Sequence, residues 1–228
     1  MINLIDIGAR GGISPPWRRE DINYLLLCDA DEEMVRIDDK CRILKECIYN
    51  DNETRLFYTY QKINTSSIFK PNWKVLKKTG KSVKNLKKKY KLIKANRVKC
   101  CRLDDLLKKY EETYNFVKTD AQGADLAILQ GMGKYINKVV GIHCECFLIP
   151  EYQEIPLYDN MLLFLSKHGF IPSRIITKHK NWIDILFVRD EDFVERNFIN
   201  NLYRRYKPYT RKKEILFFKR MSPYRKKK

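Results

Sequence analysis

The sequence has 228 residues and a formal net charge of +18, with 44% hydrophobic and 32% charged residues. This length suits one domain with a sizeable core, or one domain followed by a tail, and the start of the chain lacks the pattern of a leader peptide. No apolar stretch reaches the roughly 18 residues of a membrane-spanning helix, and seven cysteines without regular disulfide spacing predict a reducing, cytoplasmic setting.

The first thirty residues predict two strands, residues 3–7 and 24–28, joined by a glycine-containing turn. Asp29 closes the second apolar run, 23 residues after Asp6. A carboxylate at this spacing can accept hydrogen bonds from both hydroxyls of a ribose. The stretch is therefore typical of a nucleotide-type ligand site at the edge of a parallel sheet.

The turn itself, with Gly8 and Gly12, differs from the dinucleotide fingerprint because Arg10 stands where the second glycine would be. Asp6 suits the cationic amino group of S-adenosylmethionine (SAM), whereas it would repel a pyrophosphate. Glycines let the backbone approach a ligand closely, so the turn favours SAM over NAD. A tight turn without any ligand is the alternative interpretation.

Helix and strand signals continue after this turn. Ser14 predicts a short helix to about Asp21, and acidic residues from Asp31 predict the start of a second helix. Residues 42–49 predict a third strand and residues 54–60 an added one.

A polar loop, residues 63–72, is expected to reach over the mouth of the ligand site. The segment 72–96 then predicts a lysine-rich helical insertion, because apolar residues recur at steps of three and four from Trp73 to Ile93. Gly80 lies within this stripe and weakens the case for an unbroken helix.

The remaining elements alternate between strand and helix. The predicted order is strand 98–103, a helix from 104, strand 115–120, a helix through 129, strand 139–147, helix 158–168, strands 170–177 and 182–188, and a helix with a basic tail over 191–228. This alternation predicts an α/β fold with a doubly wound, Rossmann-like sheet in a domain of residues 1–190.

Asp120 ends a predicted strand, so it should face the same crevice as Gly8 and Asp29. It is the first candidate for a general base, with Lys118 and His143 as helpers or substitutes. The alternatives are a helix cap for Asp120, a structural ion pair for Lys118 and an ordinary core histidine for His143.

No metal site is predicted. Cys144 and Cys146 should face away from His143 and Glu145 on their strand, so these four side chains cannot converge on one ion. A Mg²⁺ ion between Asp120 and Glu145 is conceivable but has no further support.

The positive charge is concentrated in residues 74–99, with 12 Lys or Arg and no acid, and in residues 203–228, with 12 and one acid. The rest of the chain has a net charge of −5. Such segments suit nucleic acid, an acidic polymer or an anionic membrane surface, which would make the protein peripheral at the inner membrane face. Solvated lysine-rich surfaces without a partner explain them equally well.

Several separated segments resemble the FkbM family of SAM-dependent methyltransferases. They are residues 5–12 (IDIGARGG), 28–31 (CDAD), 66–72 (SSIFKPN), 103–106 (LDDL), 117–126 (VKTDAQGADL), 129–131 (LQG) and 184–188 (DILFV). The Lys-x-Asp-x-x-Gly segment that contains Asp120 is the most specific of these.

This resemblance implies a class I methyltransferase fold of seven strands, the last antiparallel, with SAM over the carboxyl edge of the sheet. It also implies O-methylation of a sugar, a glycan or a related small molecule. The cofactor residues that it implies are Asp6, Gly8, Ala9, Arg10 and Gly12 at the methionine and ribose, Asp29 and Ala30 at the ribose, and Ile48 to Asp51 near the adenine. The sequence departs from the family pattern at Arg10, Gln122 and Asp125.

Two other functions remain open. An RNA ribose methyltransferase would explain the basic segments, and Lys118, Asp120 and Glu145 are residue types of that chemistry. A non-catalytic binding module with a degenerate SAM pocket is the second alternative. The sequence favours the sugar or glycan O-methyltransferase.

Overall fold

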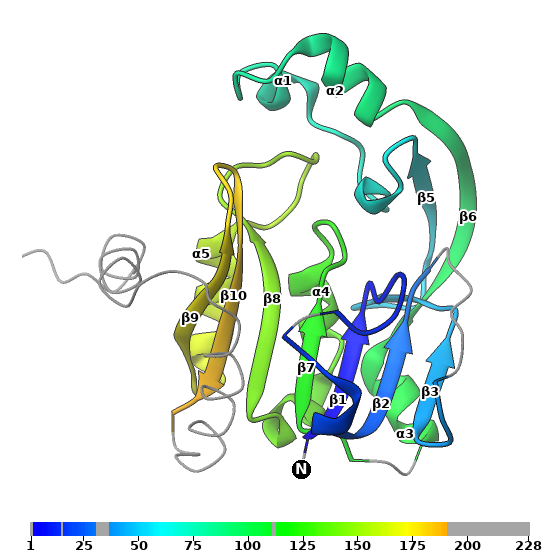
Figure 1. Cartoon of the computed structure of the whole chain (residues 1–228), viewed down its shortest axis with the longest axis vertical. Coiled ribbons are helices and arrows are strands. Elements are labelled where there is room, and N and C mark those ends of the chain that lie inside the picture. The colour runs from blue at the N-terminus through cyan, green and yellow to red at the C-terminus, as the bar shows by residue number, and fades with distance from the viewer. Residues whose placement is uncertain (1, 15, 31–36, 111–112, 191–228) are drawn as a thin grey trace, which may run out of the picture.

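The computed structural model describes residues 2–14, 16–30, 37–110 and 113–190. They form a seven-stranded sheet with packed helices, a mixed α/β fold that confirms the predicted class (Figure 1). The strand order is β3-β2-β1-β7-β8-β10-β9. The bounds are β1 Ile2–Ile7, β2 Ile22–Cys28, β3 Cys41–Leu44, β7 Phe116–Thr119, β8 Gly141–Phe147, β9 Phe170–Lys178 and β10 Trp182–Arg189.

Strands β1, β2, β3, β7 and β8 run parallel, and β10 pairs antiparallel with both β8 and β9. Across the centre of the sheet, Asp6 is in register with Lys118, and Lys118 with His143. Because the parallel strands all end at one edge, the loops that follow them gather there. This edge is where the sequence predicts the ligand site.

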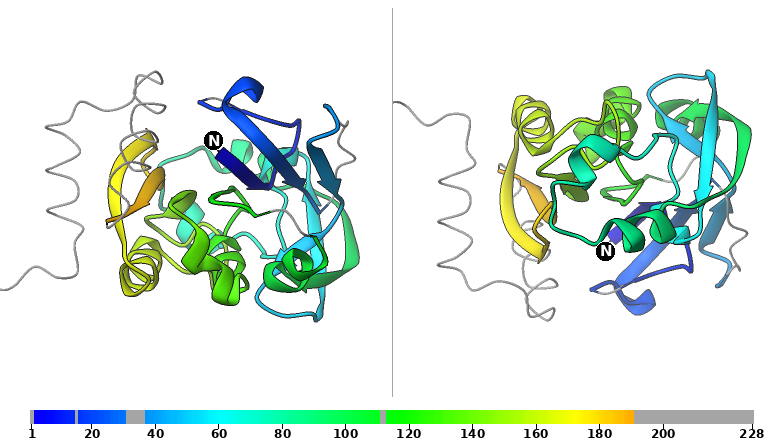
Figure 2. Two further views of the ribbon diagram at one scale, coloured as in Figure 1. Left: turned by 90° about the horizontal axis from the view of Figure 1, so that it is seen from below. Right: turned by 90° about the horizontal axis from the view of Figure 1, so that it is seen from above.

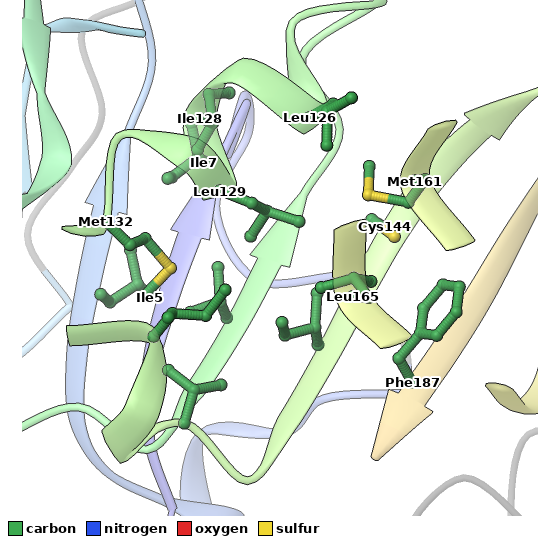
Figure 3. Packing of buried hydrophobic residues seen from close by; sticks show 14 of the residues in the cluster. Ile5, Ile7, Leu126, Ile128, Leu129, Met132, Cys144, Met161, Leu165 and Phe187 are labelled. Atoms are coloured by element: carbon green, nitrogen blue, oxygen red, sulfur yellow. The ribbon is translucent and has the colours of Figure 1, made fainter. Parts of the chain in front are cut away.

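One face of the sheet packs against helices α3 (Leu103–Lys109), α4 (Asp125–Gln130) and α5 (Tyr158–Lys167) and the 3-10 helix η3 (Gly133–Lys138). Strand alternation sends Ile5 and Ile7 to this face, where they meet Ile128 and Leu129 of α4 (Figure 3). The cysteines Cys144 and Cys146 also belong to this core cluster. Because side chains alternate along β8, they lie on the face opposite to His143 and Glu145, as predicted.

The other face carries a second apolar cluster that includes Leu4, Leu25 and Phe116. Trp17, 3% exposed, packs edge-on against Phe116 with ring centroids 4.7 Å apart. A helix was predicted over residues 14–21, but the described residues of this stretch contain only the short 3-10 turn η1 (Arg19–Asp21). The predicted helices after Asp31 and within residues 191–228 lie outside the described residues.

A second, three-stranded sheet has the order β4-β6-β5, with β4 Cys47–Tyr49, β5 Thr54–Tyr60 and β6 Leu92–Arg102. Between β5 and β6 the chain forms an arch, residues 61–91, with the 3-10 turn η2 (Ile63–Thr65) and helices α1 (Trp73–Leu76) and α2 (Val83–Lys89). Figures 1 and 2 show α1 and α2 above the carboxyl edge of the main sheet. The arch thus covers the side on which the ligand site was expected.

Two predicted elements need correction. The strand predicted over residues 42–49 is two strands in two sheets, because the chain leaves the main sheet after Leu44 and enters the second one at Cys47. The stripe from Trp73 to Ile93 is two short helices, since Gly80, with φ +81°, lies between them in a left-handed conformation. Residues 92–96 begin β6, where Ile93 is 55% exposed.

The arch is fastened to the loop after β8 through Glu151, which is 2% exposed. The backbone N–H of Asn72 donates to the Glu151 carbonyl at 2.8 Å. The Glu151 carboxylate accepts from the Tyr90 hydroxyl at 3.3 Å and pairs with Lys81 Nζ at 3.5 Å. A buried carboxylate with several donors therefore fixes the arch over the sheet edge.

The basic segment 74–99 forms much of the outer surface of the arch and β6. All of its basic side chains except Lys89 are exposed, and the apolar Leu92 and Ile93 are exposed among them. The other basic segment, residues 203–228, lies outside the described residues. Within the described ranges, no helix is long and apolar enough to cross a membrane.

Candidate active site

The ends of β1, β2 and β7 are tied together by backbone hydrogen bonds. The N–H groups of Gly8 and Ala9 donate to the Cys28 carbonyl at 2.9 and 3.1 Å. The N–H of Asp120 donates to the Ile7 carbonyl at 2.9 Å. These bonds bring the residues that follow three strands into one rigid cluster.

Gly8 permits the close approach of two of these loops. Its φ is +78°, and a Cβ atom built on it would overlap the carbonyl oxygen of Asp120. Gly11 and Gly12 also have positive φ, but a Cβ on either would meet open space. The sequence predicted that the glycine turn makes room for a ligand, and the structure shows that Gly8 makes room for the β7 loop.

A cavity of about 210 Å³ opens beside this cluster. Six of the predicted site residues line it, namely Gly8, Arg10, Asp29, Ala30, Ile48 and Asp120. The connection from β3 to β4, the second sheet and the arch contribute Glu46, Cys47, Phe57, Ile63, Asn64, Ser66 and Ile68. Part of the polar loop 63–72 thus lines this cavity.

Asp29 is the buried carboxylate of the cavity, with 7% exposure at the end of β2. Arg10 Nη2 lies 3.5 Å from its Oδ1. The lining also includes Ile48, Phe57 and Ile68, which give part of the wall an apolar character. The cavity therefore combines a hydrogen-bond acceptor for hydroxyl groups with a surface on which a flat ring can pack.

Four predicted cofactor residues, Asp6, Ala9, Gly12 and Asp51, do not line this cavity. Asp6 is fully buried, because its place within β1 turns it to the sheet face, where its Oδ1 accepts from Lys118 Nζ at 2.8 Å. Asp51 accepts from Arg55 Nη2 at 2.7 Å, since the chain has already turned into β5.

Lys118 and His143 line a neighbouring cavity of about 220 Å³, which shares Asp120 with the first one. Burial opposes the charge of Lys118, but the carboxylates of Asp6 and Asp120 outweigh it and raise the Lys118 pKa. Burial and the Lys118 charge lower the pKa of His143 to about 3. At neutral pH, Lys118 is thus protonated and paired with Asp6, and His143 is a neutral ring. Neither is therefore a strong base.

Gln122 connects the site to the arch. Its Nε2 donates to Asp120 Oδ1 at 3.0 Å and to Glu145 Oε2 at 3.1 Å, so that one amide bridges two carboxylates. Its Oε1 accepts from the Tyr152 hydroxyl at 2.9 Å, and its carbonyl accepts from the Ser67 hydroxyl at 2.9 Å. With φ +49°, Gln122 holds an unfavourable backbone conformation that these four bonds stabilise.

Three acids near Asp120 have strongly perturbed titration. Burial and then the Asp120 charge raise the pKa of Asp125 to about 6 and that of Asp184 to about 7. The same two causes raise the pKa of Glu145 well above its ordinary value. Perturbed carboxyl groups that gather beside a cavity are typical of functional sites.

Sequence reasoning missed the roles of Asp184 and Gln122 in this site. For Asp184 a signal existed, because an acid that interrupts the apolar run of β10 must turn to one sheet face with Leu186. The bridging role of Gln122 depends on contacts with residues 23 and 30 positions away, which no local pattern reveals.

The described residues contain no group of three or more His, Cys, Asp or Glu side chains arranged to hold a metal ion. Asp120 and Glu145, the pair considered for Mg²⁺, are bridged instead by the Gln122 amide. Two donated hydrogen bonds thus satisfy oxygen atoms that a cation would otherwise bind.

Comparison with known proteins identifies the family to which the sequence belongs. The family described as "Methyltransferase FkbM domain" matches residues 6–172, which contain the ends of β1, β2 and β7 and both cavities' shared residue, Asp120. No curated protein and no solved structure matches the chain significantly. The match extends over more than half of the sequence, and the chain belongs to the FkbM methyltransferase domain family.

Proposed function

We propose that this methyltransferase uses SAM to methylate a hydroxyl oxygen of a sugar or glycan. The observation that carries the proposal is that Asp29 and Asp120, at the ends of β2 and β7, line one cavity. A second, polar cavity begins at Asp120 and gives an acceptor a place beside the first.

The first cavity has the groups that SAM requires. Asp29 can accept hydrogen bonds from both ribose hydroxyls, and Ile48 and Phe57 offer the apolar wall that suits an adenine. At the other end, Asp120 and the backbone around Gly8 would face the methionine part, whose amino group and sulfur are cationic. Arg10 lies 3.5 Å from Asp29, so it would stand beside the ribose part of SAM.

When bound, SAM supplies a methyl group on a sulfonium, and its carbon–sulfur bond breaks as the new carbon–oxygen bond forms. The chain must position the acceptor hydroxyl and receive its proton. Asp120 suits the proton acceptor, because it is exposed to the cavities and Gln122 fixes one of its carboxylate oxygens. The neutral His143 and the paired Lys118 would orient the acceptor rather than take its proton.

Incubation of the full chain with methyl-labelled SAM tests this function. Nucleotide sugars, lipid-linked glycans and RNA are offered as separate pools, and incorporated label is counted in each. We expect label in a sugar-containing pool. Label confined to RNA would replace the proposal with ribose methylation, and absence of SAM binding in calorimetry would point to a non-catalytic module.

We also propose that the basic segment 74–99 contacts an anionic membrane surface from the cytoplasmic side. The exposed Leu92 and Ile93 among the lysines support a lipid surface over a purely polar polymer. Flotation with phosphatidylcholine vesicles that contain 30% phosphatidylserine, against phosphatidylcholine alone, measures this. Binding should need the anionic lipid and fall when Leu92 and Ile93 are changed to serine. Binding to neither vesicle would refute this contact.

A further inference from the structure

The second cavity lies between β7, β8, β9 and β10 on the sheet face that carries Asp6. Its lining is polar except for Ile176, and consists of Ser14, Lys118, Thr119, Asp120, His143, Ile176, Thr177 and Asp184. The cavity measures about 220 Å³ and meets the first cavity at Asp120. A group bound there would lie next to whatever occupies the first cavity.

The strand register explains why the polar residues converge. Lys118 and His143 are direct partners on β7 and β8, and Asp184 is the partner of Thr177 on β9. Residues that are paired across strands turn to the same face, so these side chains line one depression. Because adjacent strands hold them, the depression is part of the rigid sheet and exists before any ligand binds.

The chemical character of this cavity points to a hydroxylated ligand. Asp120 and Asp184 accept hydrogen bonds from hydroxyl groups, while Lys118 donates and Ser14 and Thr177 do both. An apolar acceptor would displace water from these polar groups without replacing its hydrogen bonds, and an anionic one would meet two carboxylates. A neutral sugar ring has hydroxyls that can serve as donor and acceptor at each position.

We propose that this cavity is the acceptor subsite, and that Asp184 with Thr177 holds the hydroxyls of a neutral sugar ring while Asp120 faces the hydroxyl to be methylated. This assignment rests on the proposed function and adds the place and the residues of acceptor binding. Asp184 acts here as a binding and positioning residue. Its raised pKa agrees with a carboxyl group enclosed beside Asp120.

Binding of simple sugars to the full chain tests the assignment without knowledge of the natural acceptor. The probes are the methyl glycosides of glucose, mannose, galactose and rhamnose. Their binding is measured by ligand-observed NMR with and without S-adenosylhomocysteine (SAH). The variants are Asp184→Asn, which keeps the shape of the side chain, and Thr177→Val. Asp159→Asn is the matched control, because Asp159 is an exposed acid on α5 outside both cavities.

At pH 8, where the Asp184 carboxyl group is mostly ionised, at least one glycoside should bind the unmodified chain. Asp184→Asn should weaken this binding about tenfold, the effect of one lost charged hydrogen bond. Thr177→Val should weaken it less, and Asp159→Asn should leave it unchanged. SAH affinity, measured by calorimetry, should stay within about twofold of the original in all three variants.

Failure to bind any of the four glycosides in either state, or equal affinity in Asp184→Asn, would overturn the assignment. The SAH measurement separates this result from the proposed function. If SAH binds but the glycosides do not, the acceptor subsite is wrong while a SAM-dependent function stands. If glycoside binding depends on Asp184 but SAH does not bind, the cavity assignment stands and the proposed function fails.

Discussion

Gly8 and Asp120 touch through their backbones, so closely that a single methyl group on Gly8 would overlap the Asp120 carbonyl oxygen. Gly8→Ala should therefore destabilise the protein by about 3 kcal/mol, from the left-handed φ and from the overlap together. Urea unfolding measures the loss. Gly80→Ala is the control, because Gly80 has nearly the same φ (+81°) with open space around it, and should cost only about 1 kcal/mol. Equal losses would show that the two loops are not in contact.

Asp29→Ala should weaken SAH binding at least about tenfold, because the ribose hydroxyls would lose their charged acceptor. Asp51→Ala should leave SAH affinity unchanged, since Asp51 lies outside the cavity and pairs with Arg55. Isothermal titration calorimetry compares the two. If Asp51→Ala weakens SAH binding and Asp29→Ala does not, the adenine binds near Asp51, as the sequence suggested.

Lys118→Met should destabilise the protein by about 3–5 kcal/mol, because it leaves the fully buried Asp6 without its cation. The double variant Asp6→Asn with Lys118→Met should recover much of this loss, since no uncompensated charge remains. Denaturant unfolding of the three proteins gives both differences. If the double variant is no more stable than Lys118→Met, the ion pair is not what makes the single change costly.

Burial and the charge of Asp120 raise the pKa of Asp184 to about 7. This shift determines whether Asp184 makes the folded protein more or less stable as the pH rises. Its folded-state pKa lies above the unfolded value of about 4, so the folded protein binds more protons between these pH values and loses stability as pH rises through that window. The charges of Asp120, Lys118 and Asp125 act on Asp184, Thr177 donates a hydrogen bond to it, and Glu145 is its partner on β8.

The comparison with Asp184→Asn isolates this contribution, because His143, with its pKa lowered to about 3, changes stability in the opposite sense below its ordinary pKa. Between pH 5 and 8 the unmodified chain should lose about 2 kcal/mol more than the variant. Parallel pH profiles would mean that Asp184 titrates normally.

Gln122→Glu should destabilise the protein by about 2 kcal/mol at pH 8, because a third carboxylate would replace the donor between Asp120 and Glu145. The loss should shrink at pH 5, where a protonated carboxyl group can donate again. Gln130→Glu, at an exposed position beside Asn50, should have little effect at either pH. A pH-independent loss would indicate a change of shape rather than of charge.

Local patterns were sufficient for the parts of the site that depend on one strand and its end. Asp29 and Asp120 each close an apolar run, and both line the cavity as predicted. Asp51 does not line the cavity. Its prediction assumed an unbroken third strand, whereas the chain changes sheets between Leu44 and Cys47. That exchange depends on pairing with β6, some fifty residues later, which no local pattern contains.

The same limit applies to the residues within the strands. Asp6 looked like a ligand contact from its place before Gly8, but its position within β1 turns it into the sheet toward Lys118. The sequence predicted that the glycine turn makes room for a ligand, whereas the contact that requires Gly8 is with the loop after β7. The sequence thus identified the edge of the sheet at which the cavity lies. The hydrogen-bond and ion-pair partners of the side chains could be identified only from the folded structure.

The bonds around Gln122 also restrict how this protein can diversify. Its side-chain amide is shared by Asp120, Glu145 and Tyr152, and its backbone carbonyl accepts from Ser67. A substitution at any of these positions changes which hydrogen bonds residue 122 must make. The effects of substitutions at these positions should therefore be strongly non-additive. In descendants of this chain, these positions are expected to mutate jointly.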